Sequence, residues 1–285
     1  MKSGNHFQAT LIADLGGTNA RFQILVDPNS PPQSFEPIQT TNFETIEDAI
    51  KQSVLQQSSI LPTRAIIAAA GPITEAGIRL TNSNWEISPK TFLQSCGLNQ
   101  LVLMNDFEAQ ALALPYLAPN ELQLLGSGGD IKKADGSKYD TKIVLGPGTG
   151  LGVCLLIRVA EKWVPVAGEG GHVDLGPRSS REEQIWKYLQ KADGRVSAEQ
   201  ILSGDGLLNL YTACCQADRI NAKLQSAPEV SKAAMEGCDE QAVEALEVFC
   251  QCLGRIAGDL ALTSAAKGGV YIAGGIVQKI LPYLQ

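Results

Sequence analysis

Three glycine turns, each directly after an apolar run typical of a β-strand, constrain the fold of this chain more than any other feature. The turns are Gly16-Gly17-Thr18, Gly148-Thr149-Gly150 and Gly274-Gly275. Glycine permits positive φ and close approach to the main chain, so successive N–H groups can converge on phosphate oxygens. One such turn alone is usually a plain hairpin. Three of them predict a fold that holds a phosphate-bearing ligand.

The first two glycine turns lie in the same local pattern of strand, turn and strand. Residues 11–13 and 20–26 flank the first turn, and residues 143–145 and 153–157 flank the second. We interpret this as a weak internal repeat, with one glycine hairpin in each half. A chain of 285 residues favours two domains at about 150 residues each. We expect a smaller N-terminal α/β domain over residues 1–115 and a larger C-terminal α/β domain over residues 116–285.

Between and after the hairpins, helical and strand patterns alternate. Residues 45–57 have apolar residues at helical spacing, and residues 64–70 form an apolar strand pattern. Residues 101–104 are wholly apolar, which predicts a central strand covered on both faces, followed by a helix that Pro115 stops. Residues 239–267 predict one long packed helix.

Charge and cysteine content exclude several classes of protein. With 23 Lys and Arg against 30 Asp and Glu, the net charge of -7 gives no general attraction to nucleic acid or to an anionic membrane. The seven cysteines form neither a disulfide framework nor a CxxC metal knuckle, so we expect buried, reduced thiols in a cytoplasmic protein. We expect neither a secretory signal nor a membrane span.

The two commonest nucleotide-binding signatures are missing from the sequence. No G-x-x-x-x-G-K-[ST] occurs, and residues 146–152 alternate as G-x-G-x-G-x-G rather than G-x-G-x-x-G. A P-loop fold and a dinucleotide-binding fold are therefore weak interpretations of the glycine turns.

Five motifs occur in an order that resembles the bacterial glucokinases of the actin-like ATPase superfold. They are residues 14–21 (DLGGTNAR), 104–107 (MNDF), 145–152 (LGPGTGLG), 168–174 (GEGGHVD) and 272–276 (IAGGI). The resemblance implies an α/β, two-domain actin-like ATPase (ribonuclease H-like) fold with an interdomain cleft. It implies an ATP-dependent hexose kinase, a glucokinase of glycolysis that phosphorylates the 6-hydroxyl of glucose to glucose 6-phosphate. The alternative is a non-catalytic sugar-sensing or nucleotide-switch protein of the same superfold.

Asp106 is the expected catalytic residue. It follows the apolar run 101–104, and ligands in open α/β sheets collect at the carboxyl ends of strands. A carboxylate in that place can accept the proton of an attacking hydroxyl. On residue pattern alone, an N-cap of the following helix explains Asp106 equally well. The resemblance favours the catalytic role.

The resemblance implies that Asn105, Glu169, His172 and Glu199 bind the sugar. Glycines surround Glu169 and His172, which leaves room for both side chains to point into one pocket. A sugar site needs acceptors and donors at fixed positions, because each unpaired buried group disfavours the wrong isomer. The alternatives are a hydrogen-bonded core histidine for His172 and an acidic residue in the first turn of a helix for Glu199.

The resemblance also implies ATP and Mg²⁺ as cofactors. Asp14 suits a Mg²⁺ ion held through water, because Mg²⁺ dehydrates reluctantly; the alternative is a turn-forming Asp. We expect no zinc, since no cysteine-rich motif follows His172. The expected partners are glucose and ATP, and a homodimer is left open. The expected nucleotide-binding residues are Ala13, Asp14, Leu15, Gly16, Gly17, Thr18, Gly148, Thr149, Gly150, Gly274 and Gly275.

Members of the family usually continue past the position that matches Gln285. They carry a turn near the adenosine and a closing helix that packs on the N-terminal domain. The resemblance therefore implies a shortened chain whose residues 276–284 end an incomplete adenine pocket, and which phosphorylates sugar poorly.

Overall fold

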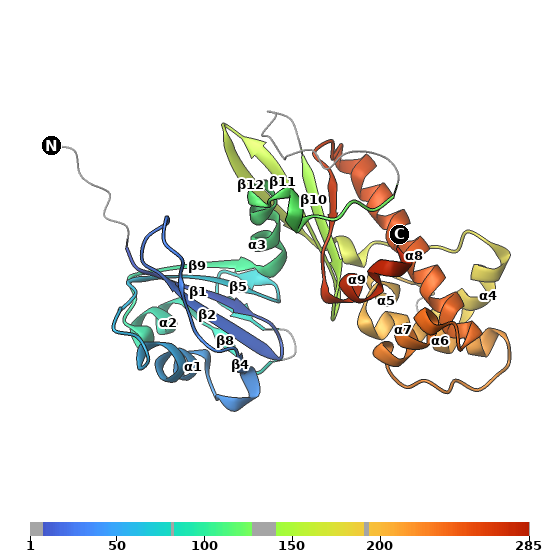
Figure 1. The fold of residues 1–285 in the computed structure, drawn as a ribbon, viewed down its shortest axis with the longest axis horizontal. Helices are drawn as coiled ribbons and strands as arrows, with labels where there is room; N and C mark the ends of the chain where they lie inside the picture. The colour runs from blue at the N-terminus through green and yellow to red at the C-terminus, as the bar shows by residue number, and fades with distance from the viewer. Residues whose placement is uncertain (1–7, 81–82, 127–140, 191–193, 285) are drawn as a thin grey trace. The chain divides into compact units, whose positions relative to one another are not determined.

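The computed structural model describes residues 8–80, 83–126, 141–190 and 194–284. The chain forms two compact units, Met1–Ala109 and Gln110–Gln285, each a mixture of strands and helices (Figure 1). The division falls inside helix α3 (Asp106–Ala113). The boundary that we place after residue 115 stays a prediction.

The first unit is built on the predicted glycine hairpin. Strands β1 and β2 pair antiparallel, β5 runs parallel to β1, and β9 runs parallel to β5. Two short strands, β3 and β4, pair with β2. A separate small sheet has the order β6-β7-β8. The bounds are β1 (Thr10–Leu15), β2 (Asn19–Leu25), β3 (Gln33–Ser34), β4 (Ile38–Gln39), β5 (Arg64–Ala69), β6 (Ile73–Thr74), β7 (Gly77–Arg79), β8 (Glu86–Ile87) and β9 (Gln100–Asn105).

Helices α1 (Ile46–Ile50) and α2 (Pro89–Cys96) cover one face of this sheet (Figure 1). Alternate residues of the strands, such as Leu11 on β1 and Ile67 on β5, are fully buried in the core that these helices complete. A π-helical turn, Lys51–Leu55, continues α1, so the helix predicted over 45–57 is confirmed in place, with residues 46–55 helical.

The predicted central strand is wrong in one respect: β9 lies at the edge of its sheet. The strand order is β3-β2-β1-β5-β9. Leu101 and Leu103 pack on the core, whereas Val102 on the opposite face is 49% exposed. A wholly apolar run therefore does not establish that both faces of its strand are covered.

The second unit repeats the hairpin arrangement of the first. Strands β10 (Lys142–Pro147) and β11 (Leu151–Val159) pair antiparallel, and β13 (Val270–Ile272) runs parallel to β10. Strand β12 (Lys162–Gly168) adds to the free side of β11. The pairings β2-β1-β5 and β11-β10-β13 correspond, which confirms the internal repeat seen in the sequence.

Helices make up most of the rest of the second unit. The longest, α8, contributes Leu246, Phe249 and Leu253 to the core. It ends at Ser264, earlier than the predicted residue 267, because Ala265 adopts a left-handed conformation with φ of 52°. The helices are α4 (Ser180–Leu189), α5 (Ala198–Ile201), α6 (Gly204–Ala217), α7 (Ala227–Glu236), α8 (Glu240–Ser264) and α9 (Gly275–Ile280). Single 3₁₀ turns cover Thr40–Asn42, Leu114–Tyr116, Pro119–Glu121, Gly170–His172 (η5) and Leu281–Tyr283.

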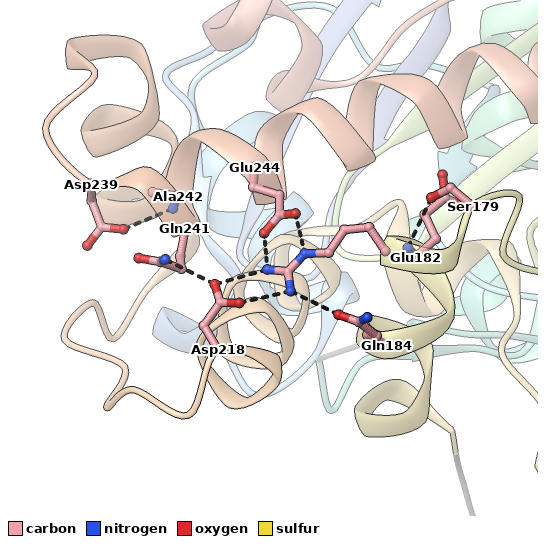
Figure 2. Close-up of polar contacts among 9 residues, drawn as sticks. Ser179, Glu182, Gln184, Asp218, Asp239, Gln241, Ala242 and Glu244 are labelled. Atoms are coloured by element: carbon pink, nitrogen blue, oxygen red, sulfur yellow. Dashed lines mark hydrogen bonds and ion pairs between the residues drawn. The ribbon is translucent and has the colours of Figure 1, made fainter.

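One polar cluster ties three of these helices together (Figure 2). Arg181 on α4 donates to both carboxylate oxygens of Glu244 on α8, at 2.7 Å each, and to Asp218 at the end of α6. These two carboxylates raise the pKa of the Arg181 guanidinium, and Arg181 in turn lowers the pKa of Asp218. A bidentate contact of this kind fixes direction as well as distance, so it orients α4 against α6 and α8.

Two further findings concern the expected absence of a membrane span and the state of the cysteines. Within the parts of the chain that the structure describes, no helix combines the length and the apolar character that a bilayer span requires. All seven cysteines are free thiols; Cys238 is exposed, contrary to the expectation of burial, and Cys250 is partly buried.

Candidate functional site

The first glycine turn joins β1 to β2 in the first unit. The Gly16 N–H donates to the carbonyl oxygen of Asn19 at 2.9 Å, and the Thr40 hydroxyl donates to the carbonyl of Gly17 at 2.9 Å. Ala13 and Leu15 are buried in the core, so only their main-chain groups are available to a ligand. The turn therefore offers backbone groups together with the hydroxyl of Thr18.

Asp14 lies on β1, directly opposite Arg21 of β2. Its carboxylate accepts a hydrogen bond from Arg21 Nη1 at 3.0 Å, and more than half of its side chain is exposed. An exposed carboxylate with one cationic neighbour fits a Mg²⁺ ion that keeps its own water shell. Among the described residues, no group of three or more His, Cys, Asp and Glu side chains is arranged to hold a metal directly.

Asn105 and Asp106 stand where β9 turns into α3. Asn105 Oδ1 accepts from the Phe107 N–H at 2.8 Å, and its amide donates to the carbonyl of Gly71 at 3.3 Å. One amide hydrogen and one lone pair remain for a ligand. Asp106 Oδ1 also accepts from the Phe107 N–H, at 3.0 Å. Because Asn105 already caps the helix, capping alone does not account for Asp106.

The Asp106 carboxyl is partly buried, and its pKa is raised. Loss of solvent is the largest cause, and the negative charge of Asp14 acts in the same direction. The N–H of Phe107 opposes the shift without cancelling it. A carboxylate with a raised pKa binds a proton more strongly, which is what a general base requires.

Three of the predicted sugar residues come together in the second unit. His172 Nε2 lies 3.7 Å from Glu169 Oε2 and 3.9 Å from Glu199 Oε1. Glu169 directly precedes the turn η5, His172 is the last residue of that turn, and Glu199 projects from the first turn of α5. The His172 side chain is 55% exposed, so the interpretation as a core histidine is wrong. Glu199 does lie in a helical first turn, and it also reaches this cluster.

Glycines let strand β11 approach this cluster closely. A Cβ on Gly171 would lie 2.3 Å from the carbonyl oxygen of Leu151, so η5 rests directly on β11. Glu199 Oε2 accepts from the Leu151 N–H at 2.9 Å, and a Cβ on Gly150 would lie 2.4 Å from that same oxygen. The second glycine turn therefore also makes room for the Glu199 carboxylate, a function that its sequence does not reveal.

The second and third glycine turns meet beside a cavity of about 340 Å³ in the second unit. Gly274 has φ of 93°, and a Cβ there would lie 2.4 Å from the carbonyl oxygen of Pro147. The turn after β13 thus packs on the end of β10. The cavity is lined by Gly148, Thr149, Gly204, Asp205, Leu207, Ala227, Pro228, Ser231, Ile276, Lys279 and Ile280.

Of the four polar or charged side chains that line this cavity, only Thr149 was expected from the sequence. Asp205, Ser231 and Lys279 come from three different helices, α6, α7 and α9. None of them belongs to a motif, and only the packing of those helices brings them together. Lys279 is the one cationic side chain among the lining residues.

Comparison with known proteins gives a consistent result. A family model described as Glucokinase matches residues 11–285. A glucokinase of Chelativorans sp. (strain BNC1) is 48% identical over 275 residues, which is 96% of this chain and 79% of that protein.

Solved structures agree. The crystal structure of a glucokinase from an Antarctic psychrotroph superposes with a TM-score of 0.83 at 34% identity, over 98% of this chain and 86% of that one. A ROK family glucokinase from Streptomyces griseus, in complex with glucose and AMPPNP, shares the fold with a TM-score of 0.56 at 21% identity, over 95% and 84% of the two chains. The expected two-domain actin-like α/β fold is confirmed. The chain belongs to the glucokinase family, the ATP-dependent hexose kinases that phosphorylate glucose, as its five motifs indicate.

Proposed function

We propose that Asp106 is the catalytic base that takes the proton of the 6-hydroxyl of glucose. The observation that supports this role is the partly buried Asp106 carboxyl at the carboxyl end of β9, with a raised pKa. As the proton moves to Asp106, the sugar oxygen attacks the γ-phosphorus of ATP in line. The bond from phosphorus to the β,γ-bridging oxygen breaks, which gives ADP and glucose 6-phosphate.

Glu169, His172 and Glu199, with Asn105, hold the sugar in this proposal. Two carboxylates accept from hydroxyl groups, and the imidazole between them can donate or accept. His172 Nε2 lies 3.7 Å from Glu169 Oε2 and 3.9 Å from Glu199 Oε1. At these distances, each of the three side chains is still partly free to bond a sugar hydroxyl. Holding two reactants in place lowers a barrier by up to about 7 to 11 kcal/mol, whereas a general base contributes about 10²- to 10⁴-fold in rate. Positioning is therefore the larger contribution.

ATP is assigned to the glycine turns and to the cavity of the second unit. Main-chain N–H groups of the turns at residues 16–18, 148–150 and 274–275 bind the phosphates, and Lys279 adds a positive charge. Asp14 holds Mg²⁺ through water. When bound, Mg²⁺ neutralises charge on the phosphate oxygens. AMPPNP in the Streptomyces griseus protein supports ATP as the nucleotide. We place the enzyme in the cytoplasm; a homodimer stays a prediction.

A coupled assay of sugar phosphate formation tests this function. Glucose should be the best acceptor in a panel of hexoses, and ATP should be a better donor than ADP or polyphosphate. Binding of glucose and ATP, measured by calorimetry, without formation of product would instead identify a sugar-sensing or nucleotide-switch protein.

Replacing His172 with Ala should raise the KM for glucose by an amount equivalent to about 1 to 3 kcal/mol, because a sugar hydroxyl loses its partner. The kcat value falls as well if that hydrogen bond strengthens in the transition state. A zinc chelator should leave both proteins unchanged. Loss of activity on chelation, restored by added zinc, would contradict the expectation that the protein binds no zinc.

A further inference from the structure

The segments that carry His172 and Glu199 are paired with each other along the main chain. The Leu175 N–H donates to the Val196 carbonyl, and the Ala198 N–H donates to the Val173 carbonyl, at 2.9 Å each. Asp174 and Ser197 form an antiparallel bridge between these two bonds. The pairing begins directly after His172 and ends directly before Glu199, so it sets how the two side chains face each other.

Arg195 adds a side-chain contact at one end of this pairing. Its Nε donates to the Asp174 carboxylate, and its Nη2 donates to the main-chain carbonyl oxygen of His172. A guanidinium can reach two acceptors at once because its donors point in fixed directions from a planar group. Arg195 therefore holds the peptide group that directly follows the imidazole-bearing residue.

His172 is held from the other side by its own turn. Its N–H donates to the carbonyl of Glu169 at 2.9 Å, and Gly171 rests on β11. The main chain of His172 is thus fixed at its N–H by η5 and at its carbonyl by Arg195. Without the second contact, the His172 carbonyl loses its side-chain donor, so the peptide after His172 is held only by the neighbouring main-chain pairing and the imidazole is less firmly placed relative to Glu199.

The ion pair between Arg195 and Asp174 is exposed to solvent, so its effect on sugar binding can be measured separately from its effect on stability. The side chains of Arg195 and Asp174 are 46% and 75% exposed. Ion pairs in such positions contribute little to stability, because water screens the charges and long side chains lose entropy. Loss of Arg195 should consequently be visible in sugar binding and hardly visible in the unfolding temperature.

We propose that Arg195 is a positioning residue of the sugar site, which acts through the main chain of His172 and touches no substrate itself. The proposal rests on the assignment of His172 to the sugar.

The test uses Arg195→Gln, Arg195→Lys, His172→Ala and the double variant Arg195→Gln/His172→Ala. Arg195→Gln should raise the KM for glucose by about 3- to 10-fold, the range for loss of one positioned hydrogen bond, with little change in the KM for ATP. Lysine can bond one of the two acceptors, so Arg195→Lys should restore part of the loss. In the double variant, the KM should match that of His172→Ala alone, because Arg195 has nothing left to position.

A matched control is Lys232→Gln, which breaks an exposed ion pair with Glu236 on α7, at 4.0 Å. Its KM values and Tm should equal those of the unaltered enzyme. Additive effects of Arg195→Gln and His172→Ala would overturn the positioning role, as would a fall in Tm with unchanged KM for glucose. If His172→Ala itself leaves the KM for glucose unchanged, the assignment of the sugar site fails instead, which is a separate result.

Discussion

Replacing Asp106 with Ala should lower kcat by about 10²- to 10⁴-fold and leave the Kd for glucose within a few-fold. Without the carboxylate, the 6-hydroxyl must lose its proton to water while the phosphoryl group is transferred. In the proposed site, the sugar would keep its contacts with Glu169, His172 and Glu199, so binding should be largely retained. Steady-state kinetics give kcat, and calorimetry with glucose alone gives Kd.

Asp106→Asn is the matched control, because it keeps the shape of the side chain and removes only its ability to accept a proton. It should be nearly as slow as Asp106→Ala. A variant at this position that keeps close to full kcat would remove Asp106 from the mechanism.

The raised pKa of Asp106 gives the reaction a pH dependence of defined direction. The base must be ionised, so kcat/KM should be constant at neutral pH and should fall as the pH drops through the raised pKa of Asp106. That fall should begin at a higher pH than for a solvent-exposed Asp. The charge of Asp14 contributes to the shift, so Asp14→Asn should move the fall to lower pH, although burial keeps part of the shift in place.

The fold was largely predictable wherever local pattern determines structure. The apolar runs on either side of the glycine turns indicated both hairpins, and helical spacing indicated α1 and α8. The edge position of β9 was not predictable, because strand order depends on which strands pair and not on the composition of one strand. The C-terminal limit of α8 depends on the left-handed Ala265, and alanine carries no signal for that conformation.

The residues of the candidate site that belong to sequence motifs, or that the resemblance to a family implies, could be predicted. The expected trio of Glu169, His172 and Glu199 does come together, although Glu199 is distant from the others in sequence. Arg195 and Lys279 could not be found in this way. Their positions depend on how one segment pairs with another and on how helices pack, and a lone basic residue looks the same on any surface.

Replacing Gly150 with Ala should raise the KM for glucose by about 10- to 100-fold, the range for a lost hydrogen bond to a charged group. The new Cβ would lie 2.4 Å from Glu199 Oε2 and 3.0 Å from Glu199 Cδ. The atoms that must move belong to the end of a flexible side chain, so Glu199 swings away while the main chain stays in place. The Leu151 N–H loses its acceptor, and the sugar loses a carboxylate.

Gly176→Ala is the control for this substitution. A Cβ at Gly176 meets nothing within 4 Å, so the change tests the effect of replacing a glycine by alanine without a collision. Gly176→Ala should keep the KM for glucose and the Tm of the unaltered enzyme. Gly150→Ala should also keep its Tm within a few degrees, because only one, partly buried hydrogen bond is lost, and the two variants should differ in sugar binding.

The double variant Gly150→Ala/Glu199→Ala decides whether Glu199 transmits the effect. With the carboxylate removed, the added methyl group has space, so the double variant should have the same KM for glucose as Glu199→Ala alone. A further increase in KM would mean that the methyl group disturbs the glycine turn itself, and the KM for ATP should then rise too, since Gly148 and Thr149 of the same turn line the proposed nucleotide cavity. An unchanged KM for ATP together with non-additive KM values for glucose would assign Gly150 to the sugar site, where its missing side chain leaves the space that Glu199 occupies.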